Sequence, residues 1–92
     1  MSRNNHDLNN LRIQIDLIDG QIVALLSERL DIAKNVAAYK KARGLEIFQP
    51  AREAEVIKNI SGKINKREYK EYILKIYGEI LEASKSLQNN QT

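Results

Sequence analysis

The sequence predicts an all-α chain of three helices, the first of them very long, that pairs with a second copy into an intertwined helical homodimer. Apolar residues recur at spacings of three and four, and they do not alternate at the period of two that strands need. The first such pattern extends over residues 8–43 of a chain of 92 residues. This length favours one domain, residues 1–92, of which we expect about 8–88 to be ordered.

The first predicted helix carries a broad apolar stripe. At about 1.5 Å per residue it is roughly 54 Å long, whereas a compact monomer of this size is about 32 Å across. We therefore expect the first helix of a second chain to cover the stripe, in a two-fold dimer. Gly44 is a good C-terminal signal after Lys40, Lys41 and Arg43. The stripe comprises Leu8, Leu11, Ile15, Ile18, Ile22, Leu25, Ile32, Val36 and Tyr39, widened by Leu26, Leu30, Ala33 and Ala37.

Two shorter helices follow. Pro50 suits the first position of a helix, which puts Gln49 at or near the N-cap and extends the helix to about Gly62. The third helix is expected from near Lys66 to about Gln88. The predicted buried side chains are Ala54, Ile57, Ile60 and Ile64 on the second helix, and Tyr69, Ile73, Ile76, Tyr77, Ile80, Leu81, Ala83 and Leu87 on the third.

Composition excludes several kinds of site. The chain has no Cys, and its single His6 lies among polar residues near the N-terminus, so a thiolate site, a His-based triad and a metal site are all unsupported. The N-terminal residues MSRNNHD have no apolar h-region, so we expect no signal peptide, and no apolar run approaches the ~20 residues of a membrane span. We expect a cytoplasmic protein without a membrane partner. The net charge of +3 favours anionic partners, but it does not decide between nucleic acid and a small acidic ligand.

Polar side chains interrupt the predicted apolar faces. Arg29 falls in the register of the long stripe, and Lys40 extends its edge. Lys40 is eleven positions after Arg29, which places the two within about 20° of the same face. On the third helix, Ser84 and Gln88 continue the edge of the apolar face one turn apart. Because buried cations without nearby acids are costly, these positions together indicate a bound anion.

Each of these side chains also has an ordinary structural explanation. Arg29 could pair with Asp16 or Glu53, and Lys40 could extend its charged head into solvent. Ser84 could bond its own helix backbone, and Gln88 could lie in a fraying last turn. The set of cations, amide, hydroxyl and glutamate can bind a polycarboxylate and stabilise charge that develops in a transition state. It is poorly equipped for covalent catalysis.

Three segments, LRIQIDLIDGQIVALLSERLDIAKNVAAYKK, FQPARE and ILEASKSLQ, together resemble the all-α (AroQ-type) chorismate mutases. The resemblance covers about residues 8–88. It implies an intertwined dimer of three-helix chains. It also implies the rearrangement of chorismate, a small dianion, to prephenate in phenylalanine and tyrosine biosynthesis, with no cofactor. The short chain leads us to expect a monofunctional enzyme.

The resemblance assigns four residues to the carboxylates and the ether oxygen of chorismate. It implies that Arg12 enters the partner chain's site and binds a carboxylate, while Arg29 is the main carboxylate clamp within its own chain. Lys40 would bond the ether oxygen and a carboxylate. Gln88 would lie on the other side of that ether oxygen.

Four further positions follow from the same resemblance. Ser84 would place a hydroxyl near a carboxylate, and Arg52 would lie at the pocket wall. Glu53 would accept a hydrogen bond from the ring hydroxyl. Many relatives have an aspartate where this chain has Gln49. If that position contributes its backbone N–H, a glutamine serves; if the carboxylate matters, Glu53 carries more of the contact.

Alternative functions remain open from the sequence. An isochorismate-pyruvate lyase shares this fold and cation set, although the adjacent Arg52 and Glu53 favour the mutase. A non-enzymatic basic helical dimer that binds nucleic acid or another protein would carry its cations in an outward stripe, whereas here the notable cations face inward. A catalytically silent sensor of a small dianion is the remaining alternative.

Overall fold

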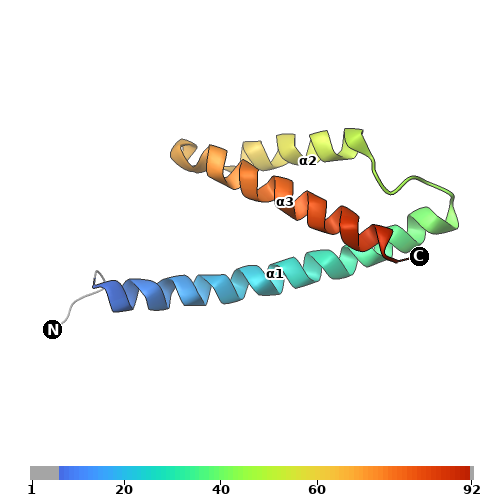
Figure 1. The fold of residues 1–92 in the computed structure, drawn as a ribbon. Helices are drawn as coiled ribbons and strands as arrows, with labels where there is room; N and C mark the ends of the chain where they lie inside the picture. Colours follow the sequence, from blue (N-terminus) through green and yellow to red (C-terminus); the bar gives the residue numbers. More distant parts are fainter. Residues whose placement is uncertain (1–6, 92) are drawn as a thin grey trace. The chain divides into compact units, whose positions relative to one another are not determined.

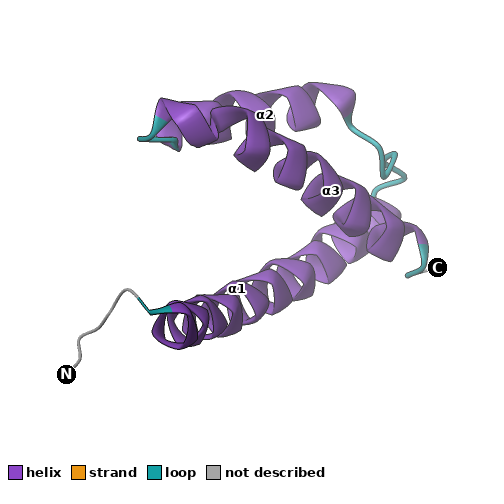
Figure 2. Ribbon diagram, turned by 60° about the vertical axis from the view of Figure 1, so that its left-hand side comes forward, coloured by secondary structure: helices purple, strands orange, loops and turns teal. Residues whose placement is uncertain are grey.

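The computed structural model describes residues 7–91, and Figure 1 shows its helices. They are α1 (Leu8–Ala42), α2 (Pro50–Lys63), the single 3-10 turn η1 (Arg67–Tyr69) and α3 (Lys70–Asn89). No strand occurs in this described range (Figure 2). The predicted all-α class with a very long first helix is confirmed, while the pairing of two chains stays a prediction.

The end of α1 is defined by Gly44. Its φ of +65° is a left-handed conformation that glycine adopts without steric cost. The N–H of Leu45 donates to the carbonyl of Lys40 at 2.8 Å, and the N–H of Gly44 donates to that of Lys41 at 3.3 Å. This is the Schellman pattern, which satisfies carbonyls left over at a helix C-terminus. The turn also reverses the chain just after Lys40.

The start of α2 follows its sequence signals. Gln49 is the N-cap residue and Pro50 is the first helical residue, as predicted. The backbone of Gln49 accepts from the N–H of Glu53 at 3.1 Å. Its side chain does not cap the helix, because Nε2 donates to the carbonyl of Glu46 at 2.8 Å. The Gln49 side chain therefore braces the preceding loop.

The start of α3 differs from the prediction. The chain is extended at Lys66, with φ −102° and ψ 105°, and the N–H of Tyr69 donates to the Lys66 carbonyl at 3.0 Å. This closes the 3-10 turn, and regular α-helical geometry begins at Lys70. Such turns are common at helix N-termini, and apolar periodicity does not distinguish them from an α-helical start.

The chain divides into two compact units, Met1–Asp31 and Ile32–Thr92, and α1 continues from one into the other. Within residues 32–91, α2 packs beside α3 (Figure 1). The most buried side chains of this part are Ala33, Ala37, Val56, Ser84 and Gln88.

The packing of α2 and α3 corrects several details of the predicted core. Tyr69, Ile76 and Ala83, all expected on the buried side of the third helix, are exposed. Ala54, expected on the buried side, is exposed, whereas Val56 is only 8% exposed. Ile57 and Ile60 are half-buried, as their spacing predicted. Residues 56, 57 and 60 lie on one helical face, and only the angle at which the helix packs decides which edge of a broad stripe is covered.

The N-terminal part of α1 presents its apolar side chains to solvent. Every large apolar side chain from Leu8 to Leu25 has an exposed fraction of 40% to 67%. So many exposed large apolar side chains on one helix are unusual for a soluble monomer and are typical of an interaction surface. Among residues 7–91, no helix combines the length and apolar character needed to cross a lipid bilayer.

Candidate functional site

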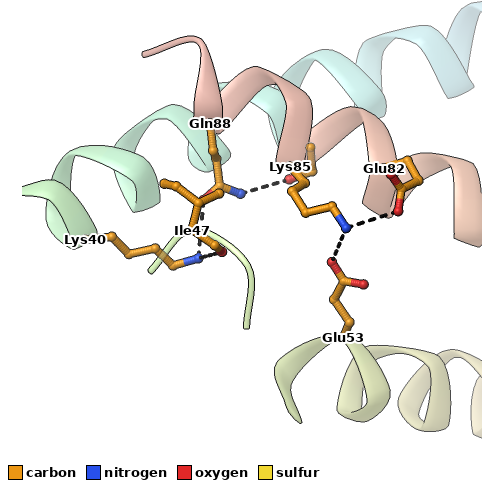
Figure 3. A network of polar contacts seen from close by, with 7 residues as sticks. Lys40, Ile47, Glu53, Glu82, Lys85 and Gln88 are labelled. Atoms are coloured by element: carbon orange, nitrogen blue, oxygen red, sulfur yellow. Dashed lines mark hydrogen bonds and ion pairs between the residues drawn. The ribbon is translucent and has the colours of Figure 1, made fainter. Parts of the chain in front are cut away.

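A polar network joins the C-terminal turn of α1 to the C-terminal half of α3 (Figure 3). Lys40 Nζ donates to the carbonyl of Ile47 at 2.7 Å and to Gln88 Oε1 at 3.3 Å. Gln88 Nε2 in turn donates to Ser84 Oγ at 3.2 Å. The structure thus brings together three of the predicted site residues, Lys40, Ser84 and Gln88.

Local structure explains why these groups meet. Ser84 and Gln88 are four residues apart on α3 and therefore share a face, where they are only 7% and 9% exposed. The turn at Gly44 sends the chain back along the end of α1, so the Ile47 carbonyl comes within reach of Lys40. An ammonium group only donates hydrogen bonds, and this dictates that the Gln88 amide turns its oxygen toward Lys40.

The electrostatics of this network suit an anion. Lys40 is half-buried, and both of its hydrogen-bond acceptors are neutral. Among residues 7–91, no carboxylate lies within ion-pairing distance of Lys40. A partly buried cation with only neutral acceptors gains from a charge-assisted hydrogen bond to an anion. The network can therefore bind a negatively charged oxygen.

A second cluster surrounds Glu53 at the start of α2. Lys85 Nζ lies 3.6 Å from Glu53 Oε2 and 3.1 Å from Glu82 Oε2 (Figure 3). The same ammonium lies 4.3 Å from the centre of the Phe48 ring. The hydrogen bond to Glu82 raises the pKa of Lys85 above its ordinary value; partial burial opposes this, and the charges of both glutamates add to it. Lys85 is therefore a cation at neutral pH.

Arg52 and Gln49 make other contacts. Arg52 Nη1 donates to Glu55 Oε1 at 2.6 Å, and the two side chains are 64% and 61% exposed. Glu55 thus offsets the unfavourable position of a cation in the first turn of a helix. Exposed ion pairs of this type contribute about 0–1 kcal/mol, so a ligand can displace one readily. In this structure neither Arg52 nor Gln49 joins the network of Lys40 and Gln88.

The two remaining predicted residues lie on the N-terminal part of α1. Arg12 is exposed and Arg29 is half-buried, and both belong to the unit Met1–Asp31. Their predicted roles stay predictions.

Among residues 7–91, no group of three or more His, Cys, Asp or Glu side chains is placed to hold a metal ion. His6 lies outside the described residues.

A small hollow opens beside Gln88, with a volume of about 180 Å³. Ligand pockets usually measure about 300–1,000 Å³, so this hollow alone does not enclose a substrate. Its lining residues are Ala37, Lys41, Leu45, Ile47, Gln88 and Gln91.

Three contributors to these networks were not found from the sequence. The Ile47 carbonyl carries no signal in the residue type, because every residue has one. Phe48 and Lys85 approach Glu53 only because α2 and α3 pack together. The available signal was the position of Lys85 directly after Ser84, on the edge of the face that carries the buried polar pair.

The family of the chain follows from comparison with known proteins. The model of the family chorismate mutase type II matches residues 11–89. This chain belongs to the chorismate mutase type II family. The resemblance found in the sequence is therefore confirmed.

Two relatives illustrate the range of this family. The chain is 38% identical over 87 residues to a bifunctional chorismate mutase/prephenate dehydratase of Aquifex aeolicus, covering 89% of this chain but 24% of that protein. It is 35% identical over 82 residues to a chorismate mutase of Methanocaldococcus jannaschii, covering 88% of this chain and 83% of the other. The chain thus spans about a quarter of the first relative and most of the second.

Solved structures agree on the fold. Chorismate mutase from Helicobacter pylori, crystallised with prephenate, is similar with a TM-score of 0.81 and 34% identity, over 91% of each chain. A conserved hypothetical protein from Pyrococcus furiosus is similar with a TM-score of 0.72 and 39% identity, over 92% of this chain and 99% of the other.

Proposed function

We propose that this chain is a chorismate mutase that converts chorismate to prephenate. The observation that carries the proposal is the contact between Lys40 and Gln88, a cation and an amide 3.3 Å apart in a partly buried site. Membership of the chorismate mutase type II family supports it. So does the similarity to a chorismate mutase crystallised with prephenate.

The proposed reaction is a pericyclic rearrangement within one molecule. A C–O bond of the ether breaks while a C–C bond forms, and the electrons move around a single ring of atoms. No external electron or proton is needed, so the reaction requires no cofactor. Negative charge grows on the ether oxygen as its bond stretches. A donor aimed at that oxygen stabilises the transition state more than the bound substrate, and this difference lowers the barrier.

Lys40 and Gln88 are the proposed donors to the ether oxygen. The Ile47 carbonyl holds the Lys40 ammonium in place, which reduces the reorganisation needed during reaction. The Gln88 amide now turns its oxygen to Lys40, so it must rotate to donate Nε2 to the substrate. Ser84 permits both orientations, because its hydroxyl accepts from Nε2 now and can donate to Oε1 after rotation.

The two carboxylates of chorismate require further cations. We propose that Arg29 clamps one carboxylate in its own chain and that Arg12 reaches a carboxylate in the partner's site. Holding both carboxylates selects the compact conformer that reacts. We further propose that Glu53 accepts a hydrogen bond from the ring hydroxyl. Arg52, at the pocket wall, would leave Glu55 and bind the substrate instead. The backbone N–H of Gln49 would make the contact at the position where many relatives have an aspartate.

The dimer is part of the proposal. The exposed apolar side chains of residues 8–25 need a partner surface, and the hollow beside Gln88 is too small to form a complete site. A second copy supplies an identical stripe, as two-fold symmetry requires. In this dimer we expect residues 1–92 to act as one domain, located in the cytoplasm and serving phenylalanine and tyrosine biosynthesis.

A turnover assay tests the proposed function. The purified full chain, shown to be helical by circular dichroism and dimeric by light scattering, is incubated with chorismate and a metal chelator. We expect chorismate to be replaced by prephenate on chromatography. A parallel reaction with isochorismate detects release of pyruvate, the lyase alternative. The proposal would be overturned if a folded dimer converted chorismate no faster than the uncatalysed reaction does.

A further inference from the structure

Lys85 is fixed by contacts from three parts of the chain. Glu82 on its own helix α3 accepts a hydrogen bond at 3.1 Å, and Glu53 on α2 lies 3.6 Å away. The ring of Phe48, from the loop before α2, lies 4.3 Å from the ammonium. The side chain of Lys85 is only 24% exposed. A lysine on the surface of a helix normally moves freely, but these contacts hold the charge at one place.

The same contacts constrain Glu53. Its side chain is 30% exposed, and Oε2 is the atom that faces Lys85. No hydrogen bond to Oε1 occurs among the described residues, so this oxygen can accept from a ligand. A carboxylate on a flexible side chain can adopt many rotamers, and the Coulomb attraction of a nearby fixed cation favours those that bring Oε2 toward it. Oε1 is then presented in a defined direction.

We propose that Lys85 is a positioning residue that aims the Glu53 carboxylate at the ring hydroxyl of the substrate. This inference rests on the proposed function, which assigns the hydroxyl contact to Glu53. Lys85 acts through Glu53 and does not itself touch the reacting atoms.

The charge balance gives Lys85 a second effect on the same step. Glu53, Glu82 and Lys85 together carry a net charge of −1, and the substrate is a dianion. Without Lys85, neither Glu53 nor Glu82 would keep an ion-pair partner among the described residues as the substrate approaches. Lys85 therefore weakens the repulsion between Glu53 and the substrate as well as directing the carboxylate.

A purely structural role for Lys85, as an ion pair that holds α2 against α3, explains these contacts less well. The Lys85–Glu53 separation of 3.6 Å is longer than a hydrogen bond, and Glu82 is 62% exposed. Partly exposed ion pairs of this kind stabilise a fold little. Direct contact of Lys85 with a substrate carboxylate is also less favoured, because two glutamates already lie beside the ammonium.

The test is the kinetics of Lys85→Met, which keeps the side-chain length against Phe48 and removes the charge. Because the hydroxyl contact is present in both bound substrate and transition state, its loss raises KM and leaves kcat nearly unchanged. We expect KM for chorismate to rise roughly fivefold to tenfold, with kcat within about twofold. Lys75→Met, the same change at an exposed position of α3, is the matched control and should leave both constants near wild type.

A double-mutant cycle separates positioning from direct binding. In a Glu53→Gln background, Lys85→Met should cause less than a twofold further change in KM, because Lys85 acts through Glu53. The proposal would be overturned if Lys85→Met raised KM as much in the Glu53→Gln background as it does alone. It would also be overturned if Lys85→Met alone left KM unchanged while the wild type turns over chorismate. Thermal melts that show both variants folded at the assay temperature exclude a loss of enzyme as the cause. A wild type without turnover contradicts the proposed function itself.

Discussion

Residues 7–31 and residues 32–91 use the same helical periodicity for different purposes. In the first region, the large apolar side chains of residues 8–25 are 40–67% exposed. In the second, two of the five most buried side chains are polar, Ser84 and Gln88. Residues 32–91 also expose large apolar side chains, among them Ile32, Tyr72 and Ile76, but of the two described regions only this one buries side chains, and two of those need hydrogen-bond partners.

This difference separates two requirements of the proposed enzyme. Burying apolar surface releases about 25 cal/mol per Å², so an exposed apolar stripe favours association with another surface. A buried polar group costs free energy unless it is hydrogen-bonded, and the network of Lys40, Ser84 and Gln88 meets that condition. The first region is thus suited to assembly and the second to ligand chemistry, and substitutions in each should have distinct effects.

The largest effect is expected from a charge in the apolar stripe. Ile22→Lys should abolish the dimer and all turnover, because a lysine buried at an interface without a partner costs several kcal/mol. Light scattering measures the mass, and circular dichroism measures the helix content. Ala24→Lys lies about 160° around the helix from Ile22 at 100° per residue and should leave the dimer intact. Equal loss of the dimer in both variants would contradict the proposed stripe.

In the second region, Lys40→Ala should spare assembly and remove catalysis. Loss of one preorganised donor to a developing oxyanion typically lowers kcat by ~10²–10³. We expect that decrease, with the dimer retained on light scattering. Lys34→Ala, at an exposed position of the same helix, is the control and should keep kcat near wild type. Near-normal kcat in Lys40→Ala would show that Lys40 is not the donor to the ether oxygen.

Mixing two inactive variants tests whether the first region also contributes to the site. If Arg12 acts in the partner's site and Arg29 in its own, a heterodimer of Arg12→Ala and Arg29→Ala chains has one site with both arginines. Random mixing makes about half of the dimers heterodimers, so about a quarter of wild-type activity should return. Activity is assayed after co-refolding, and native mass spectrometry of tagged chains verifies the heterodimers. No recovery would place both arginines in one chain's site.

The smallest effect is expected at Gly44, in the turn between α1 and the loop that carries the Ile47 carbonyl. Gly44→Ala should destabilise the protein by about 1–2 kcal/mol, because the left-handed conformation at φ +65° is unfavourable for alanine. Thermal or urea unfolding measures the change. Gly62→Ala lies within α2, where an added Cβ meets nothing within 4 Å, and should stabilise by up to ~1 kcal/mol. A stabilising Gly44→Ala would contradict the role of the Schellman turn.

Much of the fold and part of the candidate site could be predicted from residue patterns. Apolar periodicity indicated the three helices, Gly44 and Pro50 marked two boundaries, and Ser84 and Gln88 stood out as polar groups on an apolar face. These features depend on residues within about one helical turn of each other, where spacing along the chain determines direction.

Residue patterns could not predict the contacts between segments that lie far apart in the sequence. Val56 is buried and Ala54, which was predicted to be buried, is exposed, because the packing angle of α2 decides which edge of a broad apolar face is covered. The Ile47 carbonyl reaches Lys40 only through the path of the loop, and Lys85 meets Glu53 only because α2 packs on α3. Local spacing therefore specifies which residues share a helix face, whereas the relative placement of helices and loops determines which of those faces meet.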